Sequence, residues 1–173
     1  MTRRSRHVIE SQIPALRRFA FALTRDRDRA DDLVQDCLAR ALSRWHLLRS
    51  EDSLRTWLFR ILRNLHLDSG RRQARHPEQG GFDPDSHPGH AGNPETALFL
   101  SDVMGALFRL PAEQQEVLLL VGVEDFSYDA TAEILGIPRG TVMSRLARGR
   151  EALREMTGHE RPPRRGAHLR SLK

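Results

Sequence analysis

The segment SYDATAEILGIPRGTVMSRLARGREALRE, residues 127–155, constrains the fold more than any other part of the chain. A helix-turn-helix needs a small residue where its helices touch, a turn residue that tolerates unusual dihedral angles, and an apolar anchor in the second helix. Ala132, Gly136 and Val142 supply these three in order. The segment therefore predicts two helices, over 127–135 and 139–156. An ordinary helical hairpin with a glycine turn is the alternative, but the polar and basic second helix favours a helix that enters the major groove of DNA.

Apolar residues recur at helical spacing in the rest of the chain, and no strand pattern competes. The expected helices cover about 14–24, 28–46, 53–72, 97–109 and 111–121. Between them, residues 73–94 are rich in Gly, Pro, Asp and His and lack periodicity, which is typical of a flexible linker. We predict an all-α protein of two small helical domains, 8–72 and 95–157, joined by the flexible linker 73–94. A disordered basic tail, 158–173, follows.

The charge is unevenly distributed between these domains. The net charge is +5, but residues 1–72 carry 16 arginines against 9 acidic residues. Residues 95–157 carry 6 arginines against 10 acidic residues. Arginine suits the recognition of phosphates and bases, but the abundance of both arginine and alanine also fits GC-rich codon bias, which is the default explanation of the bulk excess of arginine. Basic helices on an acidic body would nevertheless localise the attraction for a polyanion.

The helix predicted over 53–72 has two different faces. Its apolar stripe consists of Leu54, Trp57, Leu58, Ile61, Leu62 and Leu65. The opposite face carries Thr56, Arg60 and Arg63, with Phe59 and His66 on its shoulder. Taken alone, the pattern favours a core helix with a solvated face. A helix that offers arginine and aromatic groups to nucleic acid is the sharper interpretation.

The helix predicted over 28–46 is apolar on one side and acidic on the other. Cys37 lies within its apolar stripe and is expected to be a small buried hydrophobe. Asp32, Gln35 and Asp36 share the opposite face. Acidic residues near a helix N-terminus stabilise the helix dipole in any case. This face would also suit docking of a partner helix with basic residues.

The sequence gives no indication of enzymatic chemistry. It has one cysteine, no phosphate-binding glycine loop and no paired nucleophile and base. The linker histidines His76, His87 and His90 share no ligand spacing, so neither a metal nor a cofactor is expected. No apolar run approaches a membrane span and no signal peptide is visible, so we expect a cytoplasmic protein without membrane insertion.

Four motifs in order resemble the extracytoplasmic-function (ECF) sigma factors of the sigma-70 family. ADDLVQDCLARAL, 30–42, is similar to sigma region 2.2, and LRTWLFRILRNLHLD…RR, 54–72, to regions 2.3–2.4. The LPAEQQEV segment, 110–117, together with the helix-turn-helix segment resembles region 4. The resemblance implies a factor that binds core RNA polymerase through the β′ clamp helices and the β flap. Such a factor recognises the −35 and −10 promoter elements, assists melting and is held by an anti-sigma factor.

The resemblance also implies roles for individual residues. The core-polymerase contacts would be Asp32, Gln35 and Asp36, and the connector 46–53 would capture a flipped −10 base. Contacts to the −10 region are assigned to Arg55, Thr56, Phe59, Arg60, Arg63, Asn64, His66, Arg71 and Arg72. Asn64 and Asp68 lie one turn apart, and for them a local structural hydrogen bond is at least as good an interpretation as contact with DNA. Contacts to the −35 element are assigned to Arg139, Thr141, Met143, Ser144, Arg145 and Arg148.

Two residues depart from the family pattern. Met143 stands where the family usually has Lys or Arg, which predicts an altered −35 preference with more weight on Ser144 and Arg148. Thr131 replaces a usual aliphatic residue, which should soften the packing of the first helix of the motif unless its hydroxyl bonds a carbonyl one turn back.

Two rival functions stay open from the sequence. A sigma-like decoy that titrates an anti-sigma factor is one, although the arginines of the 53–72 helix argue against it. A stand-alone helix-turn-helix regulator is the other, but it leaves the motifs over 30–42 and 54–72 unexplained.

Overall fold

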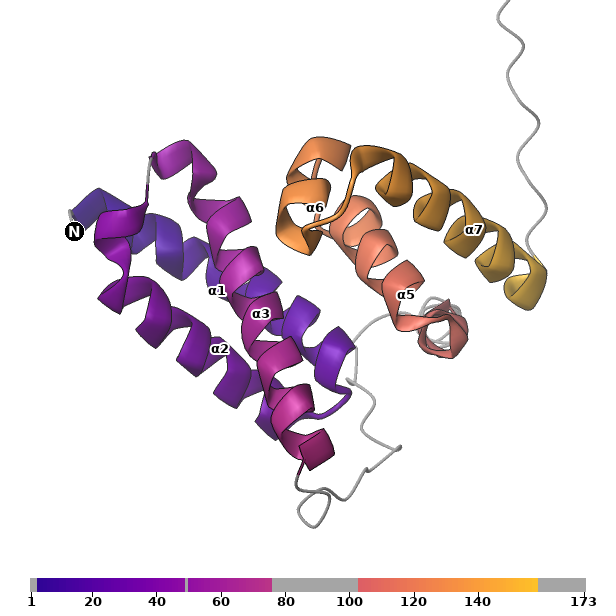
Figure 1. The fold of residues 1–173 in the computed structure, drawn as a ribbon, viewed down its shortest axis with the longest axis horizontal. Coiled ribbons are helices and arrows are strands. Elements are labelled where there is room, and N and C mark those ends of the chain that lie inside the picture. The colour runs from indigo at the N-terminus through magenta and orange to yellow at the C-terminus, as the bar shows by residue number, and fades with distance from the viewer. Residues whose placement is uncertain (1–2, 49, 76–102, 159–173) are drawn as a thin grey trace, which may run out of the picture.

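The computed structural model describes residues 3–48, 50–75 and 103–158, which are helical apart from short turns. Three helices form the first domain: α1 (Arg3–Thr24), α2 (Arg27–Ser43) and α3 (Leu54–Arg75). Two single 3-10 turns, η1 (Trp45–Leu47) and η2 (Glu51–Ser53), connect α2 to α3 (Figure 1). The three helices pack against one another in every pairing. Their shared core includes Leu16, Phe19, Ala20, Val34, Cys37, Leu54, Leu58 and Leu62.

Two of these helices are longer than the sequence predicted. α1 begins at Arg3 and continues through Pro14, where the sequence predicted its start. Proline in a helix interior removes a backbone donor. Ile9, in the part of α1 before Pro14, is 7% exposed, so its burial offsets part of that cost. α3 continues past Gly70 to Arg75, because Gly70 keeps a negative φ and only weakens the helix.

The second domain contains the predicted helix-turn-helix. Residues 103–109 are helical, followed by α5 (Ala112–Leu118), the π-helical turn η3 (Leu119–Val123), α6 (Tyr128–Leu135) and α7 (Arg139–Thr157). The Ser127 hydroxyl caps α6 by accepting a hydrogen bond from the Ala130 N–H at 3.1 Å. Gly136 ends α6 with a φ of +63°, a left-handed conformation that glycine adopts at little cost. The local signals for this motif are therefore confirmed.

The close approach of α5 to α7 depends on a second glycine. Gly149 is buried on α7, and a Cβ atom built there would lie 2.8 Å from Cδ1 of Leu118. It would also lie 3.3 Å from Cβ of Gln114. The absence of a side chain at this position lets the backbone of α7 lie directly on α5.

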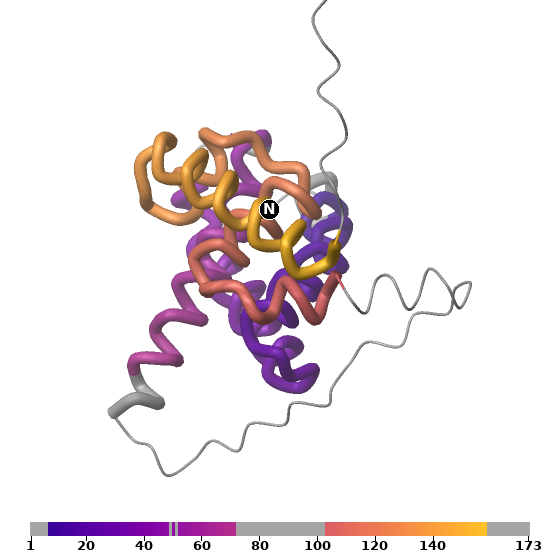
Figure 2. The backbone as a smooth tube through the Cα atoms, turned by 90° about the vertical axis from the view of Figure 1, so that its right-hand side faces the viewer, coloured from indigo at the N-terminus to yellow at the C-terminus, as the bar shows by residue number. Residues whose placement is uncertain are grey.

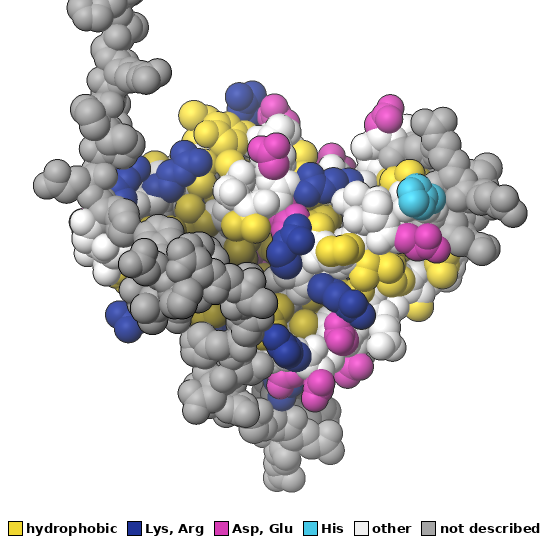
Figure 3. Space-filling model, turned by 180° about the vertical axis from the view of Figure 1, so that it is seen from behind, with side chains coloured by type: hydrophobic (Ala, Val, Ile, Leu, Met, Phe, Trp, Pro, Cys, Tyr) yellow, Lys and Arg dark blue, Asp and Glu magenta, His cyan; other side chains and the backbone are white. Residues whose placement is uncertain are grey.

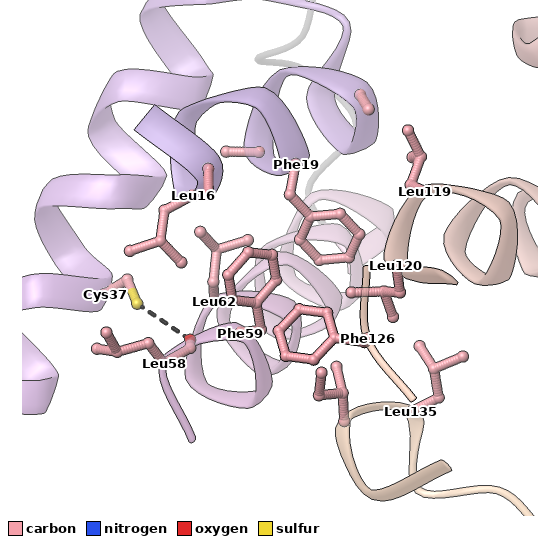
Figure 4. Close-up of a cluster of buried hydrophobic side chains, with 14 of the residues drawn as sticks. Leu16, Phe19, Cys37, Leu58, Phe59, Leu62, Leu119, Leu120, Phe126 and Leu135 are labelled. Atoms are coloured by element: carbon pink, nitrogen blue, oxygen red, sulfur yellow. Dashed lines mark hydrogen bonds between the residues drawn. The ribbon is translucent and has the colours of Figure 1, made fainter. Parts of the chain in front are cut away.

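The two domains lie against each other in both views of the backbone (Figures 1 and 2), and α3 contacts α6. Their buried side chains form one continuous cluster, in which Phe59 of the first domain meets Phe126 of the second (Figure 4). The all-α class and the two helical domains are confirmed. The predicted linker 73–94 lies outside the described residues except for 73–75, which belong to α3. Of the predicted tail, only Gly158 is described, and the domain boundaries stay predictions.

Candidate nucleic-acid interface

Two arginines of α3, Arg55 and Arg63, are held by residues outside their own helix, whereas Arg60 and Arg71 have exposed side chains. Arg55 donates from Nε to Oε1 of Gln12 on α1 at 3.0 Å, and from Nη2 to the Glu124 carbonyl oxygen at 2.6 Å. Its Nη2 also lies 3.4 Å from a carboxylate oxygen of Glu124. Arg63 makes a bidentate pair with Glu116, with N–O distances of 3.1 and 3.2 Å. Arg60 is more exposed and lies 3.9 Å from the carboxylate of Glu133.

Glu124 is the most buried carboxylate among the ion pairs of the described residues, with a side chain 2% exposed. In addition to Arg55, it accepts a bidentate pair of hydrogen bonds from Arg18 of α1, at 3.0 and 3.1 Å. A carboxylate so far from water is tolerated only when charged partners and hydrogen bonds replace its hydration. Two arginines of the first domain supply those partners.

The π-helical turn η3 determines where Glu124 points. The Glu124 N–H donates to the Leu119 carbonyl five residues back, at 2.9 Å, and the Phe126 N–H donates to the Leu120 carbonyl at 2.9 Å. Asp125 between them has a φ of +53°, which is uncommon for a residue with a side chain. The wider turn followed by this left-handed residue directs Glu124 and Phe126 together onto the first domain.

Phe59 corrects one prediction. The sequence placed it on the outward shoulder of α3 as a base-stacking candidate, but its side chain is fully buried. Its ring centroid lies 5.3 Å from that of Phe19 and 4.8 Å from that of Phe126 (Figure 4). The Arg55 guanidinium lies over the ring of Phe126, 4.2 Å from its centroid. The prediction failed because α3 is covered on a second side by the second domain.

The other predicted −10 residues lie along α3 in varied surroundings. Thr56 is half-buried and Asn64 is exposed. His66 is half-buried, and this burial lowers the pKa of its imidazole; the positive charge of Arg63 lowers the pKa further, and the negative charge of Glu116 opposes both. Arg71 lies 3.8 Å from Asp68, so the carboxylate suggested as a partner for Asn64 pairs within its own turn. Arg72 belongs to α3, but its side chain lies outside the described residues.

The predicted −35 residues lie on the first three turns of α7. Met143 is 50% exposed, and Arg148 is exposed as well. Thr141 and Ser144 are half-buried, and the Ser144 hydroxyl donates to the Thr141 carbonyl at 3.1 Å.

Two arginines of this helix are partly engaged within their own domain. Arg139 lies 3.4 Å from Asp129, and both side chains are well exposed. Arg145 is 19% exposed and lies 2.7 Å from the Glu113 carboxylate on α5, so it ties the two helices together.

The acidic face of α2 lies on the outside of the first domain. Asp32, Gln35 and Asp36 are all exposed. The opposite side of the helix buries Ala30, Leu33, Val34, Cys37 and Ala41. Burial raises the pKa of the Cys37 thiol to about 12, so this cysteine is the inert core residue that the sequence predicted.

Thr131 is fully buried in α6, and its hydroxyl has no hydrogen-bond partner. The back-bond to a carbonyl one turn earlier, which the sequence offered as one outcome, is therefore not made.

On the face shown in Figure 3, basic and acidic side chains are interspersed with hydrophobic ones. The sequence did not identify Arg18, Glu116, Glu124 and Phe126 as members of the contact between the two domains. The opposite charge balance of the two predicted domains was the one available signal.

Within the described residues, no group of His, Cys, Asp and Glu could hold a metal ion, and no helix is long and apolar enough to cross a membrane. His76, His87 and His90 lie outside the described residues.

A three-helix domain with an acidic outer face, followed by a helix-turn-helix domain, defines a two-domain helical DNA-binding protein. Comparison with known proteins gives the family. Residues 9–63 match the model described as the sigma2 domain of PhyR, and residues 100–153 match sigma-70, region 4. The chain belongs to the ECF RNA polymerase sigma factors, and its function is to direct RNA polymerase to promoters. This family is not a class of enzymes.

Relatives and solved structures agree with that assignment. The chain is 40% identical over 149 residues to the ECF sigma factor EcfG of Rhodopseudomonas palustris, covering 84% of this chain and 80% of EcfG. It is 35% identical over 144 residues to SigM of Mycobacterium tuberculosis, covering 83% and 72% of the two chains. The sigma factor RpoE of Bartonella quintana, solved with the anti-sigma factor NepR, superposes with a TM-score of 0.80 at 34% identity, covering 92% of this chain and all of that one.

Proposed function

We propose that the two domains divide promoter recognition between them. The first domain binds core RNA polymerase through Asp32, Gln35 and Asp36 and holds the melted −10 strand along α3. The second domain places α7 in the major groove of the −35 element and contacts the β flap. The exposure of the acidic face of α2, at the opposite side of that helix from its buried stripe, is the observation that carries the polymerase assignment.

The −10 assignment of α3 is supported by its arginine content and its extension to Arg75. Guanidinium groups bind phosphate oxygens bidentately, as they bind the carboxylates here. Arg60 and Asn64 are both exposed, and Arg60 also lies 3.9 Å from the Glu133 carboxylate. The −35 assignment of α7 is supported by the exposure of Met143 and Arg148 near its N-terminal half.

Run-off transcription with purified core polymerase and a library of promoter sequences tests this division. Asp32→Ala with Asp36→Ala should weaken binding to the core enzyme, measured by fluorescence anisotropy. Arg60→Ala with Asn64→Ala should leave core binding intact and reduce permanganate-detected strand opening. Arg27→Ala is the matched control, because Arg27 is an exposed arginine outside both surfaces. No core-dependent initiation at any promoter would contradict the whole proposal.

We also infer that an anti-sigma factor binds this chain. Two similar structures hold such partners: RpoE with NepR, and CnrH with the cytosolic domain of CnrY, the latter with a TM-score of 0.62 at 26% identity. A candidate anti-sigma factor, co-expressed with this chain, should suppress run-off transcription. Adding an excess of this chain should relieve that inhibition. This chain, as a sigma factor, performs no bond chemistry itself and acts in the cytoplasm, where the polymerase works. Wild-type transcription in the presence of every candidate would argue against this partner.

A further inference from the structure

Arginines of the first domain make the polar contacts with the second domain: Arg18 and Arg25, at α1 and the turn after it, and three arginines of the proposed −10 surface. Each of the three arginines in the first three turns of α3 pairs with a carboxylate of the second domain. Arg55 pairs with Glu124, Arg60 with Glu133, and Arg63 with Glu116. Arg63 also donates to the Leu135 carbonyl at 3.3 Å.

Burial shows which of these pairs hold the domains together. The side chains of Glu116 and Glu124 are 9% and 2% exposed, whereas that of Glu133 is 59% exposed. Both buried carboxylates receive bidentate hydrogen bonds from arginines of the other domain. Exposed pairs contribute little, but a buried carboxylate that lost its arginines would be strongly disfavoured. Glu116 and Glu124 can therefore stay in this position only while the first domain supplies its guanidinium groups.

An aromatic contact accompanies the charges. Phe126 is 7% exposed and lies edge-on to Phe59, with the Arg55 guanidinium over its ring. Glu124 and Phe126, two residues apart, thus present a carboxylate and an aromatic ring to the same guanidinium group, that of Arg55. A nucleotide of a single strand offers the same two groups, a phosphate for arginine and a base for stacking.

We propose that the free chain occupies a closed state, in which Glu116, Glu124 and Phe126 of the second domain take the place of the promoter strand on α3. This inference rests on the proposed −10 function of α3. Carboxylate and phosphate compete for the same guanidinium groups, so the strand and the second domain exclude each other from Arg55 and Arg63. Promoter opening then requires the second domain to leave α3, which the assembly of the polymerase and the −35 contact would drive.

A distance measurement tests the closed state without any DNA. Spin labels are placed at Ala39→Cys on α2 and Ala147→Cys on α7, which are both exposed. The native Cys37 thiol, buried and with a pKa raised to about 12, should stay unlabelled. Pulsed dipolar spectroscopy of the full chain should give one narrow distance. Glu116→Gln with Glu124→Gln should broaden it towards longer distances, and a broad distribution in the unaltered chain would overturn the proposal.

A matched control and a charge exchange separate the pairs from general charge effects. Glu151→Gln with Glu155→Gln removes the same charge from exposed positions of α7 and should keep the narrow distance. Arg63→Glu should open the chain, and adding Glu116→Arg should restore the closed distance. If the restored pair stays open while circular dichroism shows intact helices, the Arg63–Glu116 pair does not hold the domains.

Binding of a labelled random-sequence single-stranded 20-mer pool, followed by anisotropy, tests the competition. If closed chains outnumber open ones by roughly ten to one, Glu116→Gln with Glu124→Gln should lower the apparent Kd about tenfold. The Glu151/Glu155 control should change it far less. An equal Kd for the unaltered chain and the Glu116/Glu124 variant would refute occlusion. Arg60→Ala then separates the causes: weaker binding would leave the −10 role of α3 standing, and unchanged binding would refute that role as well.

Discussion

Thr131 offers a stringent test of the packing of the helix-turn-helix domain. Its side chain is fully buried in α6 and its hydroxyl has no partner. A buried hydroxyl without a hydrogen bond costs about 1–3 kcal/mol of desolvation free energy. Valine has the same shape and a similar helix propensity, so Thr131→Val should recover part of that cost without a steric change. We expect the free energy of unfolding to rise by about 1 kcal/mol.

The measurement is urea unfolding of the full chain, followed by far-ultraviolet circular dichroism. With a typical slope of about 1–3 kcal/mol per molar urea, the midpoint should rise by roughly 0.3–1 M. Thr24→Val is the matched control, because the Thr24 hydroxyl donates to the Ala20 carbonyl at 2.9 Å and accepts from the Asp26 N–H at 3.4 Å. The control should be destabilised. A lower midpoint for Thr131→Val at an unchanged slope would refute the reasoning.

Three further predictions concern other parts of the chain. Gly149→Ala should destabilise the second domain by about 1–3 kcal/mol, because the added Cβ would press on Leu118. Gly140→Ala is the control and should not destabilise it, because a Cβ there has nothing within 4 Å. Thermal melting temperatures of the two variants make the comparison. Since burial lowers the pKa of His66 from 6.5, the unfolded chain binds more protons just below that value. The free energy of unfolding should therefore fall as the pH drops through about 6.5, and His66→Gln should remove that part of the dependence in urea titrations at several pH values. Met143→Arg should change the −35 sequences recovered in a binding selection, and unchanged sequences would contradict its role.

The helix-turn-helix was predictable because its determinants are local. Ser127 and Gly136 act on backbone groups within a few residues of themselves, and the apolar spacing of α6 and α7 reports one buried face each. The same applies to α2, where Cys37 was placed correctly in the core. Short-range interactions of this kind can be predicted from the sequence, because the interacting residues are close together along the chain.

The surroundings of α3 were not predictable in the same way. Periodicity assigns one buried face to a helix, so it placed Phe59 towards solvent, whereas a second domain covers that side. The partners of Arg18 and Arg63 lie 106 and 53 residues away along the chain, across a segment without any pairing signal. The charge balance of the two domains indicates attraction between them, but not which carboxylate meets which arginine. The −10 and −35 assignments of individual residues stay predictions.

The π-helical turn η3 makes the coupling between the domains adjustable by chain length. A π turn holds one residue more than the α-helix it interrupts. Deleting one residue from Leu119–Val123 would allow a regular α-helix in place of the π turn, and would remove the wide turn that presents Glu124 and Phe126 to the first domain. Glu124 and Phe126 would then lose the backbone geometry that directs them onto α1 and α3, and if the exposed Gly122 is the residue deleted, the buried Leu119 and Leu120 stay in the chain. A single-codon deletion could thus convert a self-closing factor into one whose two halves move independently, which gives evolution a simple way to set basal activity.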